Sequence, residues 1–188
     1  KDGVCRKCLN RLSPEIKVFN NSDHIDSVVS LFPYNDAFKK LLSLLKFQKH
    51  KTIGDLLCRV ITENLNKLTL GPVDLWVPVP IHLKRLKSRG YNQVDLLFYP
   101  AIQSINGVYL PLVSRIKNTD HLFELSSEER IKMLNNAFEV CDSVCLKNKH
   151  VMILDDIFTS GATISEIAKL LKKHNAKKVS ALTFTYVL

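Results

Sequence analysis

The segment of residues 151–163 contains the residue types that bind a phosphorylated sugar. An apolar run from Val151 to Leu154 is followed directly by two carboxylates, Asp155 and Asp156. A turn of small and hydroxyl-bearing residues then leads into a helical pattern; its members are Thr159, Ser160, Gly161, Ala162 and Thr163. A helix N-terminus offers unpaired N–H groups and a positive dipole end to a phosphate. Carboxylates accept hydrogen bonds from vicinal hydroxyls or help to hold Mg²⁺, so the segment predicts a ribose 5-phosphate site.

A purely structural interpretation of the same segment is a strand, a turn and a helix with Ser/Thr capping and two solvated acids. The segment is not a Walker A loop, because no Gly-Lys-Ser/Thr follows, and it lacks the G-x-G-x-x-G turn of dinucleotide sites. Each part alone is unremarkable, but the complete string arises rarely by chance. We therefore favour the functional interpretation.

A second group of candidate binding residues follows the short apolar run Val73–Pro80. Four cations stand within the six residues from Lys84 to Arg89. Next to a rigid proline turn, Arg supplies forked donors and Lys a point charge for a diphosphate. Taken alone, the segment also fits a basic helix start with Asn92 as its cap. Together with the phosphate segment, it predicts diphosphate contacts from Pro78, Val79, Lys84, Arg85 and Arg89.

Lysines gather on the outer face of the helical pattern that begins at Asp36 and in the loop after it. They have no acidic residue between them and are Lys39, Lys40, Lys46, Lys49 and Lys51. Such a cluster attracts a nucleic-acid backbone, and it is equally typical of an ordinary solvated helix face. These lysines are candidate nucleic-acid contacts.

Two of the five cysteines form a lone C-x-x-C at Cys5 and Cys8. Two thiolates at this spacing supply half of a tetrahedral four-cysteine zinc site, and the other half is absent from this sequence. Zn²⁺ is therefore a candidate ligand of Cys5 and Cys8. An odd cysteine number without a visible signal peptide favours a reducing, cytoplasmic setting.

Strands alternate with helices along the rest of the chain. Strands are expected near 28–32, 73–80, 149–154 and 179–187, and helices near 36–45, 54–68, 92–105, 128–138 and 163–174. This alternation predicts an α/β fold with a mostly parallel sheet flanked by helices. Residues 107–127 are expected to form an irregular loop.

The composition restricts the class of protein further. The chain has 188 residues and a formal net charge of +9, which suits a polyanionic partner such as nucleic acid or a polyphosphate. Basic surfaces that bind nothing in particular are also common. No apolar run approaches the roughly 20 residues that cross a bilayer, so membrane insertion is excluded. The chain begins at Lys1 rather than Met, and we expect upstream residues to be missing.

Residues 151–163 resemble the phosphoribosyl diphosphate (PRPP) motif of type I phosphoribosyltransferases. The resemblance implies a parallel sheet flanked by helices, ribose contacts from Asp155 and Asp156, a 5-phosphate cradle at 159–163, and Mg²⁺ accompanying the diphosphate. V-P-V-P at 77–80 with R-G-Y-N-Q at 89–93 resembles the ComF family of phosphoribosyltransferase-like competence proteins.

Further features agree with the ComF family and extend the resemblance over almost the whole chain. They are C-x-x-C-L at Cys5, Cys8 and Leu9, then Tyr34, L-K-F at 45–47, Arg115 with Thr119, and Arg130 with Ala137 and Phe138. The resemblance implies that residues 1–24 are the remnant of an N-terminal zinc-binding region and that 25–188 form the phosphoribosyltransferase-like domain. It also implies a role in DNA uptake with single-stranded DNA and a helicase-like partner.

Two functions remain open at this point. In one, the chain binds PRPP and acts in natural transformation; in the other, it is a salvage enzyme that transfers 5-phosphoribosyl to a nucleobase. In the enzyme, Arg89 and Mg²⁺ would stabilise the departing diphosphate while Asp155 and Asp156 position the ribose. Leu122 and Met133 stand where the family carries Gln and Asn, which weakens the case for transfer more than that for binding. His82 and His121 are candidate bases by location only.

Overall fold

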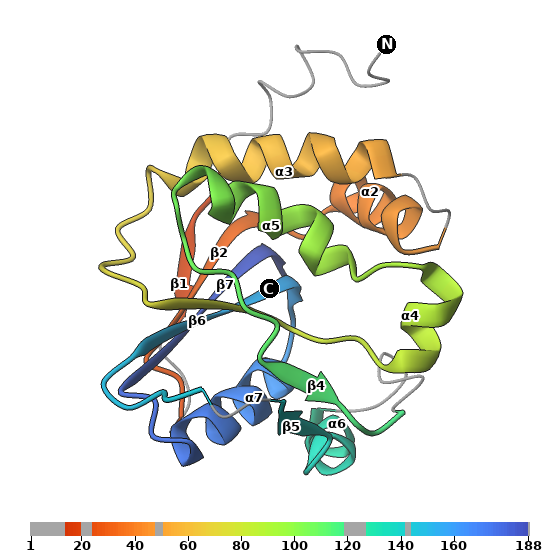
Figure 1. Cartoon of the computed structure of the whole chain (residues 1–188). Helices are drawn as coiled ribbons and strands as arrows, with labels where there is room; N and C mark the ends of the chain where they lie inside the picture. The colour runs from red at the N-terminus through yellow and green to blue at the C-terminus, as the bar shows by residue number, and fades with distance from the viewer. Residues whose placement is uncertain (1–13, 20–23, 48–50, 119–126, 142–143, 188) are drawn as a thin grey trace.

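The computed structural model describes residues 14–19, 24–47, 51–118, 127–141 and 144–187. Its centre is a five-stranded sheet with the order β1-β2-β7-β6-β3 (Figure 1). The strands are β1 (Lys17–Phe19), β2 (Ser27–Pro33), β3 (Leu75–Pro78), β6 (His150–Phe158) and β7 (Lys178–Tyr186). Strands β2, β7, β6 and β3 run parallel, and β1 pairs antiparallel with β2 at one edge. The expected mostly parallel α/β fold is confirmed.

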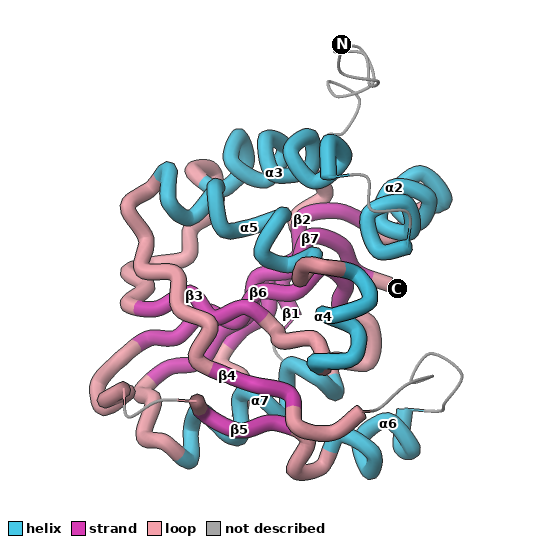
Figure 2. Tube along the Cα trace, turned by 45° about the vertical axis from the view of Figure 1, so that its right-hand side comes forward, coloured by secondary structure: helices cyan, strands magenta, loops and turns pink. Residues whose placement is uncertain are grey.

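Helices cover both faces of the sheet (Figure 2). One face carries α2 (Asp36–Phe47), α3 (Lys51–Leu65) and α5 (Gln93–Ser104). The other carries α7 (Ala162–Lys173), beside α6 (Ser127–Leu134) and a two-stranded sheet of β4 (Val113–Arg115) and β5 (Phe138–Val140). Helices α2, α3, α5 and α7 each bury apolar side chains three and four residues apart, which is why these segments fold as amphipathic helices.

Strand β6, which lies between β7 and β3, separates two apolar layers of the core. Met152 and Leu154 pack among the side chains of α2, α3 and α5, whereas Val151 and Ile153 pack on the α7 side. This alternation follows from the two-residue period of a strand. Burial of each large apolar side chain contributes about 1.5–3 kcal/mol, so the two layers fix β6 firmly in the middle of the molecule.

Strand β6 is longer than the sequence indicated. We expected it to end at Leu154 with the carboxylates just beyond, but its pairing with β7 continues to Phe158, opposite Tyr186. The hydroxyl of Thr185 on β7 donates to the backbone carbonyl of Asp156 at 3.0 Å. Asp155 and Asp156 are therefore held inside a paired strand and point to opposite faces of the sheet.

Most of the expected helices and strands are present, but the sequence did not predict several short ones. Helix α3 begins at Lys51 rather than at residue 54, and β1, β5 and the seven-residue helix α4 (Leu83–Arg89) were not foreseen as separate elements. Strand β4 lies inside the segment expected to be irregular. Three-residue strands are too short to show a periodicity, and α4 ends because Gly90 adopts the left-handed conformation at φ 85°.

No helix among the described residues is long and apolar enough to cross a membrane. The segment assigned to a zinc-binding remnant, residues 1–24, lies largely outside the described residues, and so do Cys5 and Cys8. The division at residue 24 and the zinc ligands therefore stay predictions.

Candidate functional site

The turn between β6 and α7 has the geometry expected of an anion site. Gly161 occupies the N-cap of α7 with φ 72°, and no side chain caps the helix there. Only glycine adopts this conformation without strain, and a Cβ at this position would stand 3.0 Å from the ring of Phe158. Thr159 and Ser160 are exposed. Among the described residues, no side chain caps the N-terminus of α7, and the neighbouring Thr159 and Ser160 are open to solvent.

A pocket of about 320 Å³ opens at this turn. Residues 157–164 form one wall, and the other lining residues are Tyr34 at the end of β2, Leu134 of α6 and Asp155 of β6. Parallel strands end together at this edge of the sheet, which is where open α/β sheets bind ligands. The turn is thus neither buried in the core nor plugged, and a carboxylate shares its pocket.

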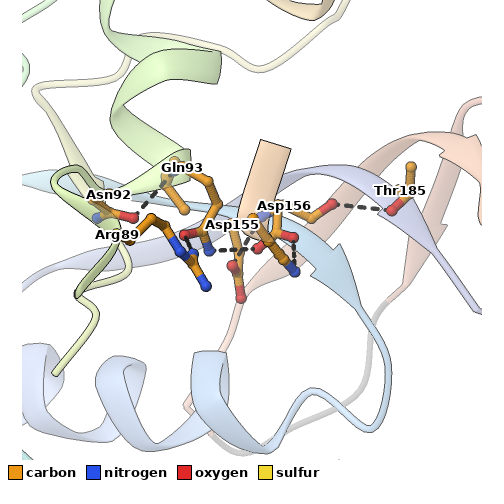
Figure 3. A network of polar contacts seen from close by, with 8 residues as sticks. Arg89, Asn92, Gln93, Asp155, Asp156 and Thr185 are labelled. Carbon is orange, nitrogen blue, oxygen red and sulfur yellow. Dashed lines mark hydrogen bonds and ion pairs between the residues drawn. The ribbon is translucent and has the colours of Figure 1, made fainter. Parts of the chain in front are cut away.

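The two carboxylates of β6 have different surroundings (Figure 3). Asp155 is half-buried, lines the pocket, and accepts the backbone N–H of Asp156 on Oδ1 at 2.8 Å. Asp156 is only 4% exposed. Its Oδ1 accepts from the side-chain amide of Gln93 at 3.1 Å, and its Oδ2 forms an ion pair with the Lys46 ammonium. Asp155 faces the pocket, while Asp156 is held by other residues of the protein.

These surroundings separate the pKa values of the two acids. Burial and the adjacent charge of Asp156 raise the pKa of Asp155 well above its ordinary value. Burial also opposes the charge of Asp156, but the ammonium of Lys46 and the amide of Gln93 outweigh it and lower the pKa of Asp156. Asp156 is thus the permanent anion of the pair, and a cation arriving beside Asp155 would relieve an unfavourable charge.

Lys46 was expected on an outer, nucleic-acid-facing surface, and the structure places it in the site instead. It lies near the end of α2, one residue after Leu45, which is fully buried, and its side chain is 22% exposed. Lys39 and Lys40 of the same helix are exposed, as expected. Lys49 and the side chain of Lys51 lie outside the described part of the chain. The position of Lys46 four residues after the buried Leu42 was the signal that could have revealed its direction.

Arg89 brings a second cation to the acidic pair. It is the last residue of α4, and its guanidinium donates to the side-chain oxygen of Gln93 (Figure 3). Burial lowers the pKa of Arg89, and the charge of Asp156 opposes that shift. Gln93 therefore stands between a guanidinium and a carboxylate, a contact that its position in the sequence did not reveal.

The rest of the R-G-Y-N-Q segment fixes the geometry around Gln93. Asn92 caps α5 by accepting the N–H of Val94 at 3.1 Å, as anticipated for a capping residue. Its amide also donates to the carbonyl of Val79 at 3.0 Å, which attaches α5 to the end of β3. The hydroxyl of Tyr91 donates to the carbonyl of Leu45 at 2.5 Å and attaches the segment to α2.

The other residues expected to bind diphosphate lie around α4. Pro78 and Val79 are buried, and the Val79 N–H donates to the carbonyl of Leu154 at 2.9 Å. Lys84 is exposed and Arg85 is half-buried. The Val79 N–H group is thus already bonded to β6 within the protein. Contacts of Lys84 and Arg85 with a diphosphate stay predictions.

The candidate bases are not brought together with the acids. The ring nitrogen Nδ1 of His82 accepts the backbone N–H of Lys84 at 3.3 Å and caps α4, and His121 lies outside the described residues. Within the described ranges, no three His, Cys, Asp or Glu side chains converge on a metal position. A single pocket-facing carboxylate, Asp155, fits Mg²⁺ bound mainly through a ligand's phosphates, because Mg²⁺ typically takes only one or two protein carboxylates.

Comparison with known proteins identifies the family of this chain. Residues 112–187 match a family model described as "Phosphoribosyl transferase domain". Competence protein F of Haemophilus influenzae is 30% identical over 167 residues, which cover 82% of this chain and 70% of that protein. The chain belongs to the ComF competence protein family.

Other similar proteins include the DNA utilization protein YhgH of Salmonella typhi, 29% identical over 180 residues that cover 93% of this chain and 74% of that one. Among solved structures, adenine phosphoribosyltransferase of Thermoanaerobacter pseudethanolicus has a TM-score of 0.44 at 14% identity, covering 74% of this chain and 83% of the other. Hypoxanthine phosphoribosyltransferase of Staphylococcus aureus has a TM-score of 0.42 at 13% identity, covering 73% and 74%. The resemblance to the ComF family, inferred from R-G-Y-N-Q and the phosphate segment, is confirmed.

Proposed function

We propose that this ComF family chain binds PRPP and acts in DNA uptake, handling single-stranded DNA during natural transformation. The observation that carries PRPP binding is the shared pocket of Asp155 and the uncapped N-terminus of α7. A diol acceptor stands there beside a phosphate cradle. Membership of the competence family supports the cellular role.

The proposed ligand fits the chemistry of each part of the site. The N–H groups of α7 and the hydroxyls of Thr159, Ser160 and Thr163 would hold the 5-phosphate. Asp155 would accept hydrogen bonds from the ribose hydroxyls. Arg89, with Lys84 and Arg85 of α4, would bind the diphosphate. Mg²⁺, held by Asp155 and the ligand, would neutralise diphosphate charge when bound.

Calorimetric titration of PRPP with and without Mg²⁺ tests this proposal. We expect Mg²⁺-dependent binding that falls at least tenfold in D155N and stays unchanged in D55N, a matched substitution of an exposed aspartate on α3. Ribose 5-phosphate should compete with PRPP, whereas ribose should not. Absence of binding by the unmodified chain, or equal losses in D155N and D55N, would refute the proposal.

Single-stranded DNA binding is supported by the net charge of +9 and by the exposed Lys39 and Lys40 of α2. A backbone-driven interaction weakens steeply with salt. Fluorescence anisotropy with a labelled oligothymidylate should therefore show weaker binding at 200 mM than at 50 mM salt, and still weaker binding for K39Q/K40Q. Salt-independent binding would contradict this mode. A helicase-like partner and Zn²⁺ at Cys5 and Cys8 belong to the same proposal.

Transfer of 5-phosphoribosyl to a nucleobase is the second candidate function, and the cation Arg89 close to Asp156 favours it. In that reaction the bond from the anomeric carbon to the diphosphate oxygen breaks, the diphosphate leaves with the bonding electrons, and a bond to a base nitrogen forms as that nitrogen loses its proton to water. Catalysis would come from charge stabilisation and positioning. Diphosphate release from PRPP with candidate bases, above that of a D155A/D156A variant, would establish it. Binding without release would leave the chain a binding protein.

A further inference from the structure

A buried chain of polar contacts runs through Gln93 and joins three elements that are distant in sequence. The Arg89 guanidinium at the end of α4 donates to Gln93 Oε1, and Gln93 Nε2 donates to Asp156 Oδ1 at 3.1 Å on β6. The Lys46 ammonium on α2 holds the other oxygen of Asp156. Gln93 is only 6% exposed and lies in the middle of this chain (Figure 3).

The side chain of Gln93 is placed by its neighbours on both sides of the sequence. Asn92 caps α5 directly before it and attaches the helix to Val79. Gln93 is the first residue of α5 and therefore leaves the helix at a fixed point next to β6. This arrangement leaves its amide little freedom to move away from Arg89 and Asp156.

A side-chain amide satisfies both neighbours of Gln93. Its carbonyl oxygen accepts from a guanidinium while its NH₂ group donates to a carboxylate. A carboxylate at this position would repel Asp156, an ammonium would repel Arg89, and an apolar side chain would leave both groups without this partner. The residue type is thus dictated by the need to connect a cation to an anion.

End contacts of this kind help to hold helix α4 in position. None of its side chains is buried, and Leu83 and Leu86 are 64% and 38% exposed. No apolar packing of α4 therefore fixes where its cations stand. The Arg89–Gln93–Asp156 contacts connect the end of this helix to β6.

We propose that Gln93 is a positioning residue that holds the Arg89 guanidinium beside the acidic pair, where the diphosphate of PRPP arrives. This inference rests on the proposed function and adds a separate element to it. Gln93 does not touch the ligand, and it makes the site selective for a ribose phosphate that carries diphosphate. Loss of Gln93 leaves Asp156 in place, because Lys46 still holds the other oxygen. The ribose and 5-phosphate contacts therefore survive that loss.

The test compares two ligands in the presence of Mg²⁺, PRPP and ribose 5-phosphate, by calorimetry. In Q93M we expect PRPP affinity to fall at least tenfold, while affinity for ribose 5-phosphate changes less than threefold. The matched control is Q103M, which alters an exposed glutamine on the same helix and should change neither affinity. R89M should show the same selective loss as Q93M, and R89M/Q93M should lose no more than R89M alone.

The outcomes distinguish this inference from the proposed function. If the unmodified chain binds neither ligand, the proposed function fails. If the unmodified chain binds both and Q93M loses both equally, Gln93 is only structural and this inference is wrong. Additive losses in R89M/Q93M would also overturn it, because the two residues would then act independently. If Q93M does not fold, the test rests on R89M. A loss of ribose 5-phosphate affinity in R89M equal to its loss of PRPP affinity then refutes the inference.

Discussion

The ion pair between Lys46 and Asp156 gives the sharpest stability prediction. Replacing Lys46 by Met removes the ammonium and leaves a carboxylate whose side chain is 6% exposed. Breaking a buried pair from one side costs about 3–5 kcal/mol. The Lys46 side chain is 22% exposed, and Gln93 still donates to Asp156, so the loss should fall at or somewhat below the lower end of that range. We expect K46M to lose about 2–3 kcal/mol of unfolding free energy, or about 5–10 °C in Tm.

Urea unfolding followed by fluorescence of Trp76, the only tryptophan of the chain, measures this loss. K40M is the matched control, because Lys40 is an exposed lysine of the same helix and should cost less than about 0.5 kcal/mol. K46M/D156N removes both charges and should be more stable than K46M alone. Losses that add to within about 0.5 kcal/mol in the double variant, or equal effects of K46M and K40M, would refute the buried ion pair.

Three further predictions concern the same end of the sheet. D155N should stabilise the ligand-free chain by about 1 kcal/mol at pH 7, because it removes a buried charge next to Asp156. Because the pKa of Asp155 is raised in the folded chain, the cost of Asp155 to folding stability is absent below the unfolded-state pKa near 3.8 and grows as pH rises through the folded-state pKa. The stability that D155N gains in urea unfolding should therefore vanish near about pH 4. G161A should weaken ribose 5-phosphate binding in calorimetry at least tenfold, whereas G71A, with φ 68° and no atom within 4 Å of its Cβ, should not. N92A should cost about 2 kcal/mol in thermal unfolding, because it removes a helix cap and the bond to Val79; an unchanged Tm would contradict that role.

The sequence predicted the turn at 159–163 because the residues that form it are all local. An apolar strand, adjacent acids and a small-residue turn within residues 151–163 already determine where the chain bends and which groups face solvent. The length of β6 was not predictable in the same way. It depends on the pairing of Phe158 with Tyr186 on a strand later in the chain.

The partners of Asp156 could not be read from sequence spacing. Lys46 and Gln93 come from two other elements, and only the packing of α2 and α5 on one face of the sheet brings them to the acid. The spacing of the lysines alone grouped Lys46 with the exposed Lys39 and Lys40. Burial of Leu42 and Leu45 beside it is what turns the side chain inward.

The family signature R-G-Y-N-Q shows the same limit. Its basic and polar residues indicated diphosphate binding, but three of them form hydrogen bonds to other parts of the protein. Tyr91 holds α2, Asn92 holds β3, and Gln93 joins Arg89 to Asp156. A signature can thus encode the alignment of a site as well as its contacts.

A crystal structure of the chain with ribose 5-phosphate and Mg²⁺ tests the central claim most directly. The account predicts phosphate oxygens on the N–H groups at the start of α7, with the ribose hydroxyls turned toward Asp155. Density for the sugar phosphate at another place on the protein, with the turn at 159–163 empty at saturating ligand, would contradict it.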